Sequence, residues 1–268
     1  MFDYIVIGAG SAGCVLAARL SAAHRVLLIE AGRANPAWDF RLHMPAALSE
    51  VLTSTRYNWA FETEPEPFLG QRNLYCPRGK VVGGSSSING MIFVRGHAED
   101  FNRWSTTYGA DGWSYEDVLP FFKRSETKAG GDPDFRGQTG PLKITNGDTS
   151  SPLCQAWLDA GEANGFGRTP DFNGATQEGF GPFDRTVADG LRQSVARAYL
   201  SPKNDPALSG LTILTQAEVQ QIEFNGDRAT GVQVLVGGRL KSFQASQEII
   251  LSAGAIKSPQ VLMRSGIG

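Results

Sequence analysis

Two glycine-rich segments, far apart in the chain, have the residue types that hold a phosphate-containing ligand. The first is Gly8-Ala9-Gly10-Ser11-Ala12-Gly13, and the second, Gly79–Asn89, contains two adjacent glycines followed by three serines. Glycine lets the backbone approach a ligand closely, and consecutive free N–H groups form a site for anions. Two such segments indicate one long ligand held at both ends, and a flavin dinucleotide has that shape.

The elements around the first segment are those of a βαβ unit. The apolar run Tyr4–Ile7 is typical of a strand buried on both faces of a parallel sheet. Residues 14–20 have a helical pattern, and a second strand is expected at Val26–Ile29, closed by Glu30. A glycine turn between strand and helix, with an acid after the second strand, is a dinucleotide fingerprint.

Each residue of this fingerprint has a physical role. Gly8 allows the tight turn, Gly10 admits the pyrophosphate, and Gly13 lets the helix pack on the strand. The helix N-terminus holds the phosphates, and Glu30 accepts hydrogen bonds from the adenosine ribose. The pattern predicts dinucleotide binding against the alternative of an ordinary glycine turn, and by itself it does not separate FAD from NAD.

Composition excludes several classes of protein. The 268 residues suffice for one large domain or two ordinary ones, and the net charge of −2 gives no electrostatic reason to bind nucleic acid. The three cysteines, Cys14, Cys76 and Cys154, are odd in number and widely spaced, which disfavours disulfides and a zinc site. A first strand at Tyr4 leaves no room for a signal peptide, and no apolar run is long enough to cross a membrane. We expect a soluble, cytoplasmic protein.

The middle of the chain predicts loops and amphipathic helices. Residues 33–70 are irregular and proline-rich, as expected of long loops and short helices that cover a cofactor. Three helices are expected at Tyr115–Lys123, Leu153–Asn164 and Ser194–Leu200, and residues 130–140 form a turn-rich loop.

From residue 211 onward the apolar pattern has a period of two. Thr212–Leu214, Val219–Phe224 and Gly231–Val236 predict an antiparallel meander. Glu248–Gly254 then predicts a buried strand, and Ser258-Pro259 the start of a last helix, with serine as N-cap. The final residues, 265–268, are glycine-rich and give no sign of a finished domain, so we expect the natural protein to be longer.

The second glycine-rich segment and its flanks resemble a known family. The stretch from Cys76 to Met91 resembles the first signature of the glucose–methanol–choline (GMC) oxidoreductases, a flavoprotein family, and Gly254–Gly268 resembles the second. Arg95–Phe101 and Gly112–Phe122 are also similar to the family, so the resemblance covers the whole chain in order. It favours FAD over NAD, and the chain is most similar to the bacterial choline-dehydrogenase-like members.

The resemblance implies a set of cofactor-binding residues. The ADP half of FAD would be held by Gly8, Gly10, Ser11, Ala12, Gly13, Glu30 and Ala31. The ribityl chain and isoalloxazine would run along Arg78, Gly79, Val82, Gly83, Gly84, Asn89, Gly90, Met91 and Val94. Val219 would contact the adenine through its backbone, Ala253 and Gly254 would close over the pyrophosphate side, and Trp59 would line either the adenosine region or the lid region.

The resemblance also implies a fold and a division into domains. We expect an α/β protein (α+β overall), in which a doubly wound, Rossmann-like FAD-binding domain with a β-meander is joined to part of a substrate-binding domain. The FAD-binding domain would comprise residues 1–98 and 206–268, and residues 99–205 would form the partial substrate-binding domain. The remainder of that domain would come from sequence beyond residue 268.

The implied activity is FAD-dependent alcohol oxidation, with hydride passing from the alcohol to flavin N5. Some relatives attach FAD to a histidine where this chain has Ile88, so the FAD here should be non-covalent. The family's catalytic base is a histidine late in the full-length protein, and none of His24, His43 and His97 lies in such a context. We therefore assign no catalytic residue or metal ligand to this chain and expect little turnover from it alone.

Other functions stay open at this point. The family also contains hydroxynitrile lyases, and the chain could act as a non-catalytic flavin-binding module. The substrate, the electron acceptor and the oligomeric state do not follow from the sequence. Ser85–Ser87 lack the Gly-x-Ser-x-Gly setting of a serine nucleophile. The aromatic residues between Trp104 and Phe122 are expected to pack in a core rather than to form a substrate cage.

Overall fold

The structure, a computed structural model, describes residues 1–200 and 206–268. The chain forms two compact units, the first made of residues 1–90 and 194–268 and the second of residues 91–193. The division expected from the sequence lay at residues 98 and 205, and the latter boundary falls at the edge of residues 201–205, outside the described residues. The assignment of FAD and substrate binding to separate domains stays a prediction.

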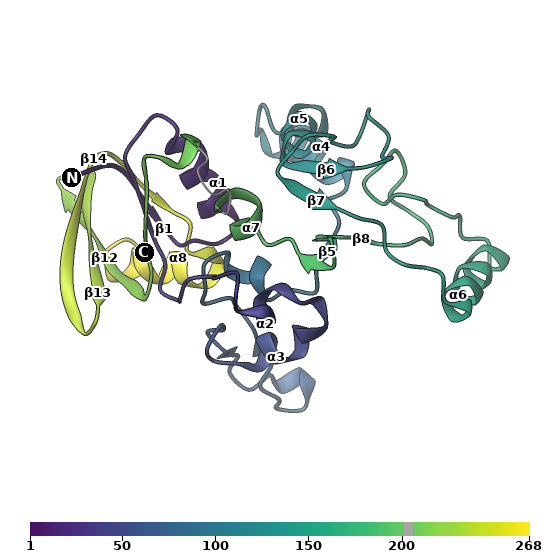
Figure 1. The fold of residues 1–268 in the computed structure, drawn as a ribbon, viewed down its shortest axis with the longest axis horizontal. Coiled ribbons are helices and arrows are strands. Elements are labelled where there is room, and N and C mark those ends of the chain that lie inside the picture. The colour runs from purple at the N-terminus through teal and green to yellow at the C-terminus, as the bar shows by residue number, and fades with distance from the viewer. Residues whose placement is uncertain (201–205) are drawn as a thin grey trace. The chain divides into compact units, whose positions relative to one another are not determined.

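The first unit is built on a six-stranded sheet with the strand order β11-β2-β1-β14-β13-β12. Figure 1 labels β1, β12, β13 and β14 of this sheet. Strands β1 (Phe2–Ile7) and β2 (Val26–Ile29) pair in parallel, and β14 (Arg239–Leu251) pairs in parallel with β1 on its other side. The alternate side chains of β1 and β2 enter two different hydrophobic clusters, so both faces of these strands are buried. The mixed α/β class with a parallel sheet is confirmed.

The strand β11 (Leu211–Leu214) corrects the expected meander. It pairs in parallel with β2, in the register Leu211 with Val26, and therefore extends the parallel sheet. The meander consists instead of β12 (Ala217–Asn225), β13 (Arg228–Val236) and β14. An edge strand and a meander strand both show a period of two, which is why the pattern did not separate them.

Helices cover both faces of the parallel strands in the first unit. Helix α1 (Ser11–Leu20) and the short α7 (Val195–Leu200) pack on one face of the parallel strands. Helix α8 (Gly254–Arg264) packs on the other face through Val261. The prediction that α8 begins at Ser258-Pro259 is wrong, because Gly254, with φ +83°, turns the chain out of β14 directly into the helix. Near its end, β14 is half-buried rather than buried as expected.

The segment between β2 and the second glycine-rich segment contains loops and short helices, as expected. It includes α2 (Phe40–His43), α3 (Leu48–Thr53), β3 (Phe61–Glu62) and β4 (Tyr75–Cys76), with 3-10 turns at Pro45–Ala47 and Pro67–Leu69. A third hydrophobic cluster joins this segment to the second glycine-rich one, with Tyr57 from the former and Val81 and Ile88 from the latter. Ile88 is thus a core residue.

The second unit contains short strands and three longer helices. Its strands are β5 (Ile92–Phe93), β6 (Glu126–Lys128), β7 (Leu142–Ile144), β8 (Asp184–Arg185), β9 (Val187–Ala188) and β10 (Leu191–Arg192), paired two by two. Helices α5 (Tyr115–Ser125) and α6 (Pro152–Ala163) lie where the sequence predicted them, whereas α4 (Ala98–Tyr108) was not anticipated.

The aromatic residues of α4 and α5 do not form the expected buried core. Phe101 contacts Trp104, Tyr115 and Phe122, yet Trp104 is 43 % exposed and Phe121 68 % exposed. A helix hydrophobic on more than one side cannot bury all of its apolar surface against one neighbour. In the part of the chain that the structure describes, no helix is long and apolar enough to span a membrane.

Candidate functional site

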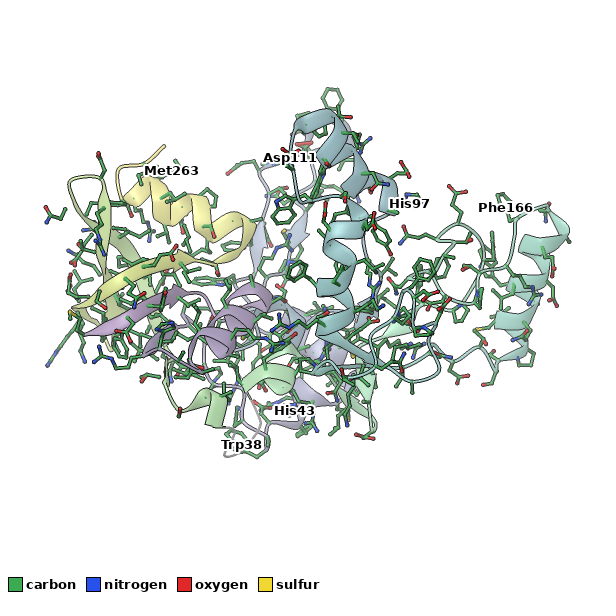
Figure 2. All side chains as sticks on the ribbon, turned by 90° about the horizontal axis from the view of Figure 1, so that it is seen from above. Trp38, His43, His97, Asp111, Phe166 and Met263 are labelled. Carbon is green, nitrogen blue, oxygen red and sulfur yellow. The ribbon has the colours of Figure 1, made fainter. Side chains whose placement is uncertain are left out.

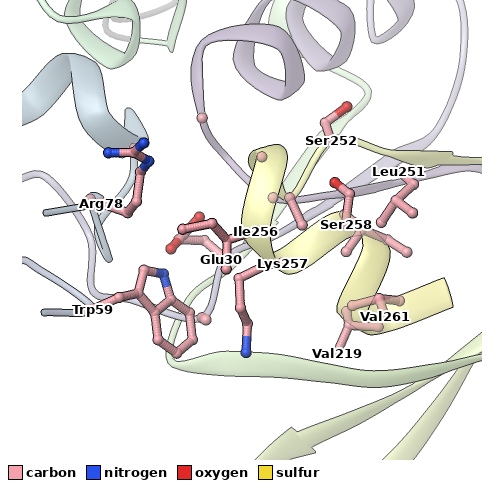
Figure 3. Close-up of a pocket in the computed structure, with 18 of the residues that line it drawn as sticks. Glu30, Trp59, Arg78, Val219, Leu251, Ser252, Ile256, Lys257, Ser258 and Val261 are labelled. Carbon is pink, nitrogen blue, oxygen red and sulfur yellow. The ribbon is translucent and has the colours of Figure 1, made fainter. Parts of the chain in front are cut away.

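A cavity of about 520 Å³ lies in the first unit, at the carboxyl ends of β1 and β2 (Figure 3). Open α/β sheets bind ligands at this end of their parallel strands. Thirteen of the predicted site residues line it: Gly8, Gly10, Ser11, Ala12, Glu30, Ala31, Trp59, Arg78, Gly79, Gly84, Val219, Ala253 and Gly254. They come from segments that span most of the chain, so the fold brings the two glycine-rich segments to one cavity.

The three glycines of the fingerprint each have the surroundings that their expected roles require. Gly8 has φ +97°, and a Cβ there would lie 2.6 Å from the carbonyl oxygen of Ser252, so the turn admits no side chain. A Cβ on Gly13 would collide with the carbonyl oxygen of Gly8, because α1 packs closely against the turn. Gly10 faces open space, since a Cβ there would meet no atom within 4 Å, and it lines the cavity. The free space is therefore where a pyrophosphate needs it.

The N-terminus of α1 points its backbone at the same cavity. The helix begins at Ser11 with Gly10 as its N-cap, and no side chain caps it. The first N–H groups of a helix have no intrahelical partner, and the helix dipole favours negative charge there. Ser11 and Ala12 line the cavity beside these groups. The helix terminus and the open space at Gly10 together fit a pyrophosphate.

Glu30 is the acidic group of the cavity and is only 6 % exposed. Its carboxylate accepts hydrogen bonds from the backbone N–H of Ala9 at 3.0 Å and of Gly32 at 2.8 Å. Burial raises the pKa of Glu30 to about 7, against the opposing effect of these two hydrogen bonds and of the Lys80 ammonium. Hydroxyl donors from a ribose would favour the ionised carboxylate, so the site fits a ligand that supplies them.

The second glycine-rich segment packs directly against the first. The N–H of Gly83 donates to the carbonyl oxygen of Ala9 at 2.7 Å, and a Cβ on Gly84 would lie 2.7 Å from Cα of Gly10. The sequence suggested two segments at opposite ends of a ligand, whereas in the structure they are neighbours. Gly84 must therefore be glycine, because the backbone of the first segment leaves no room for a side chain there.

The three serines of the second segment fix its shape. Ser85 Oγ accepts from the N–H of Gly79 at 3.1 Å, and Ser87 Oγ donates to the carbonyl oxygen of Val82 at 3.1 Å. Ser86 Oγ accepts from the N–H of Val195 at 3.0 Å and donates to the carbonyl oxygen of Gly83. The hydroxyl groups thus hold the turn and its neighbour α7 in place.

Seven predicted site residues do not line the cavity: Gly13, Val82, Gly83, Asn89, Gly90, Met91 and Val94. Val82 is a core residue of the first cluster, and Gly83, at φ +98°, allows the turn. Met91 and Val94 belong to the second unit, where the carbonyl oxygen of Met91 accepts a hydrogen bond from Thr186. Their roles toward a cofactor stay predictions.

Sequence reasoning missed further residues of the cavity. They are Ile7, Ile29, Phe61, Ser85, Ala217, Glu218, Leu251, Ser252, Ala255, Ile256, Lys257, Ser258 and Val261. Those from 251 to 261 adjoin Ala253 and Gly254, and the turn from β14 into α8 was the signal that could have found them. Phe61 carries no local signal, since only the tertiary structure places it beside Trp59.

The histidines and cysteines have structural surroundings. His97 is the N-cap of α4, where its Nδ1 accepts from the N–H of Glu99, and His43 is buried with its Nε2 3.1 Å from the carbonyl oxygen of Pro36 (Figure 2). Cys14 is buried, and burial raises its thiol pKa to about 12. Within the described residues, no group of side chains has the make-up of a metal site.

Sheet topology, glycine turn and buried acid define a dinucleotide-binding α/β protein. A sequence profile of the family described as GMC oxidoreductase matches residues 2–268, and the chain belongs to this family. Members of the family and their structural neighbours are FAD-dependent flavoproteins. The resemblance noted in the sequence is thereby confirmed.

Similar proteins include choline dehydrogenases and flavoprotein oxidases. The chain is 47 % identical to an oxygen-dependent choline dehydrogenase of Photobacterium profundum, covering all of this chain and 47 % of that protein. It is 50 % identical to one of Yersinia pseudotuberculosis, covering 48 % of it. Pyridoxine 4-oxidase from Mesorbium loti superposes with a TM-score of 0.91 at 35 % identity, over 99 % of this chain and 52 % of that one. The chain thus spans about half the length of the curated relatives it matches.

Proposed function

We propose that this chain is the cofactor-binding portion of a choline-dehydrogenase-like, FAD-dependent alcohol oxidoreductase. The observation that carries the proposal is the cavity in which Gly10 leaves open space beside the uncapped N-terminus of α1, with Glu30 buried next to it. This combination suits a pyrophosphate joined to a ribose. The sequence identities of 47 % and 50 % to choline dehydrogenases support an alcohol as the substrate.

The roles proposed for individual residues follow from their surroundings. Gly10, Ser11 and Ala12 hold the pyrophosphate, and Glu30 accepts from the ribose hydroxyls. Val219 and Trp59 line the adenosine region, while Gly79 and Gly84 continue the wall of the cavity. FAD, when bound, supplies the redox chemistry, and the chain's own residues bind it, orient it and exclude water. The buried, aliphatic Ile88 supports a non-covalent cofactor.

The rest of the reaction is assigned outside these residues. The second unit contributes part of the substrate-binding domain, and the base that accepts the alcohol proton comes from the half of the protein beyond residue 268. The three free cysteines, none paired, support a reducing, cytoplasmic location.

The direct test is flavin uptake and reduction by the full-length protein. The wild type should bind FAD and lose its flavin absorbance when choline or another alcohol is added without oxygen. Gly10→Val should abolish FAD uptake because the valine side chain fills the space left for the pyrophosphate. Gly167→Val is the matched control, since no atom lies within 4 Å of its Cβ position and its φ suits any residue.

The outcomes of this test are distinct. A wild type that takes up no FAD would overturn the proposal. Bound FAD that no alcohol reduces would confine the protein to flavin binding, and cyanide release from a cyanohydrin would identify a lyase instead. A colourless protein active with a nicotinamide cofactor would show that the cavity holds NAD.

A further inference from the structure

Lys257 reaches from the first turns of α8 along the wall of the cavity, beside the Trp59 indole (Figure 3). Its ammonium lies 4.3 Å from the centre of the indole ring and donates a hydrogen bond to Oε1 of Glu218 at 2.9 Å. Its side chain is 13 % exposed. An ammonium over an aromatic face, partly removed from water, is held by both electrostatic contacts more firmly than an exposed ion pair.

The Trp59 platform is itself fixed. Asn58 is 2 % exposed, and its Oδ1 accepts from the N–H groups of Ala60 and Arg78, each at 2.9 Å. The backbone N–H of Trp59 donates to the carbonyl oxygen of Arg78 at 2.9 Å. The Phe61 ring stacks parallel to the indole, with ring centres 5.8 Å apart. The indole therefore has a defined place in the cavity wall.

Lys80 shows which end of the cavity this platform occupies. Its ammonium lies 4.2 Å from the centre of the same indole ring, and its charge also favours the ionised form of Glu30. Glu30 is the residue that the fingerprint assigns to the ribose. Trp59 and Lys257 therefore lie toward the adenosine end, where Glu218 and Val219 begin β12.

An ammonium carries three N–H donors and no acceptor. Within the described part of the chain, one of these donors is given to Glu218, and Lys257 lines the cavity, so a ligand there can take another. Adenosine offers ring nitrogens and ribose oxygens as acceptors at this end. Glu218 and Trp59 both contact the ammonium, so its position in the cavity wall is fixed before a ligand binds.

We propose that Lys257 is a binding residue for the adenosine half of the cofactor, aimed by Glu218 and by the face of the Trp59 indole. The proposal rests on the proposed function, since it specifies a contact to FAD in the same cavity. It assigns a role to a residue outside the two glycine-rich segments, within the stretch Gly254–Gly268 that resembles the family's second signature. Glu218 and Trp59 are then positioning residues for that contact.

The test is a comparison of ligands by titration of the full-length apoprotein with FAD, ADP and FMN. Lys257→Met keeps the length of the side chain and removes the charged donor, so FAD and ADP should each bind about ten-fold more weakly. Lys257→Arg keeps a charged donor and should stay within a few-fold of the wild type. Any affinity for FMN, which lacks adenosine, should not depend on Lys257. Lys241→Met, on the exposed part of β14, is the matched control.

A double-mutant cycle tests the positioning by Glu218. Glu218→Gln should weaken ADP binding less than Lys257→Met does, and the double variant should be no worse than Lys257→Met alone. If Lys257→Met binds FAD and ADP as tightly as the wild type, or loses FAD affinity but not ADP affinity, the proposal is wrong while FAD binding stands. A wild type that binds neither FAD nor ADP would overturn both.

Discussion

The two units of this chain have interiors of opposite character. The three hydrophobic clusters found among the described residues all lie in the first unit, built from strands and helices such as β1, β2 and α1. In the second unit, charged groups occupy the interior: Arg136 and Glu126 are fully buried, and Arg95, Lys128 and Asp184 nearly so. One unit is held together mainly by apolar packing and the other mainly by ion pairs.

The ion pairs of the second unit form one connected network. Arg136 donates to Glu126 at 2.7 Å, to Asp171 at 2.6 Å and to Asp184 at 2.7 Å. Glu126 also accepts from Arg95 at 2.9 Å, and Lys128 pairs with Asp184. Removal of one member leaves buried partners with uncompensated charge, so such a network depends on every member. An apolar core loses stability more gradually, in proportion to the buried volume removed.

The largest effect should come from Glu126→Gln, which leaves Arg95 and Arg136 without their shared carboxylate. Breaking a buried ion pair from one side costs about 3–5 kcal/mol. Hydrogen exchange should show loss of protection in residues 91–193, with the first unit little changed. Glu116→Gln, at an exposed position of α5, is the matched control. Unchanged protection around Arg136 would mean that apolar contacts hold this unit as well.

A similar but confined loss is expected in the first unit from Leu28→Ala. Leu28 has no exposed surface and lies in the cluster beneath α1, so the substitution should cost about 2–5 kcal/mol. Chemical denaturation should measure the loss of stability, and hydrogen exchange should locate it in β1, β2 and α1. Leu240→Ala, where the side chain is 62 % exposed, should change the free energy of unfolding little. Equal effects of the two substitutions would contradict the packing described for the first unit.

The buried acid of the cavity predicts a pH dependence of FAD affinity. The pKa of Glu30 is raised to about 7 in the protein without ligand, and ribose donors favour its ionised form, so affinity should rise with pH and level off above about 7. Between pH 8 and pH 6 the dissociation constant should increase about ten-fold, because only about a tenth of Glu30 is then ionised. Titrations should give a flat profile for Glu30→Gln. Affinity that rises toward acid pH would refute this role.

The same shift affects folding with the opposite slope. The pKa of Glu30 is about 7 in the folded protein, against an ordinary value of 4.5. Between these two pH values the folded state therefore binds more protons than the unfolded state. Its contribution to the free energy of unfolding therefore falls as pH rises from about 4.5 to about 7. FAD should offset this loss, since it stabilises the ionised form.

The smallest effect concerns a helix of the second unit. Ser114 and Asp117 form a capping box at the start of α5, in which the Asp117 carboxylate accepts from the N–H of Ser114 at 3.0 Å. Ser114→Ala should cost about 1 kcal/mol, measured by thermal denaturation. Ser151→Ala, at an N-cap of α6 that makes no side-chain hydrogen bond, is the comparison. A loss as large as that of Glu126→Gln would show that α5 contributes to the buried network.

The sequence predicted those features whose signals are local. The apolar runs of β1 and β2, the helix α1 between them and the glycine turn follow from short patterns, and the cavity lies where they meet. The partner of β11 is chosen by tertiary pairing with β2, which a three-residue alternation does not specify. The start of α8 depends on the turn at Gly254, so the familiar proline signal pointed to the wrong residue.

The missed parts of the site share one physical cause. Lys257, Glu218 and Phe61 lie on three segments that are distant in the sequence, and they become neighbours only through the fold. The buried network of the second unit is similar, since Glu126, Asp171 and Asp184 are separated by many residues. Charged residues in a sequence are usually exposed, so nothing in the local pattern marks these as buried.

The pairing of β1 with β14 has a consequence for biosynthesis. The hydroxyl of Tyr4 donates to Gln247 Oε1, a partner 243 positions later in the chain. During translation, the apolar strand β1 must therefore wait until almost all of this sequence has left the ribosome before its second neighbour arrives. Contacts of such long range close slowly. Nascent chains should thus present β1 and β2 to chaperones for much of their synthesis.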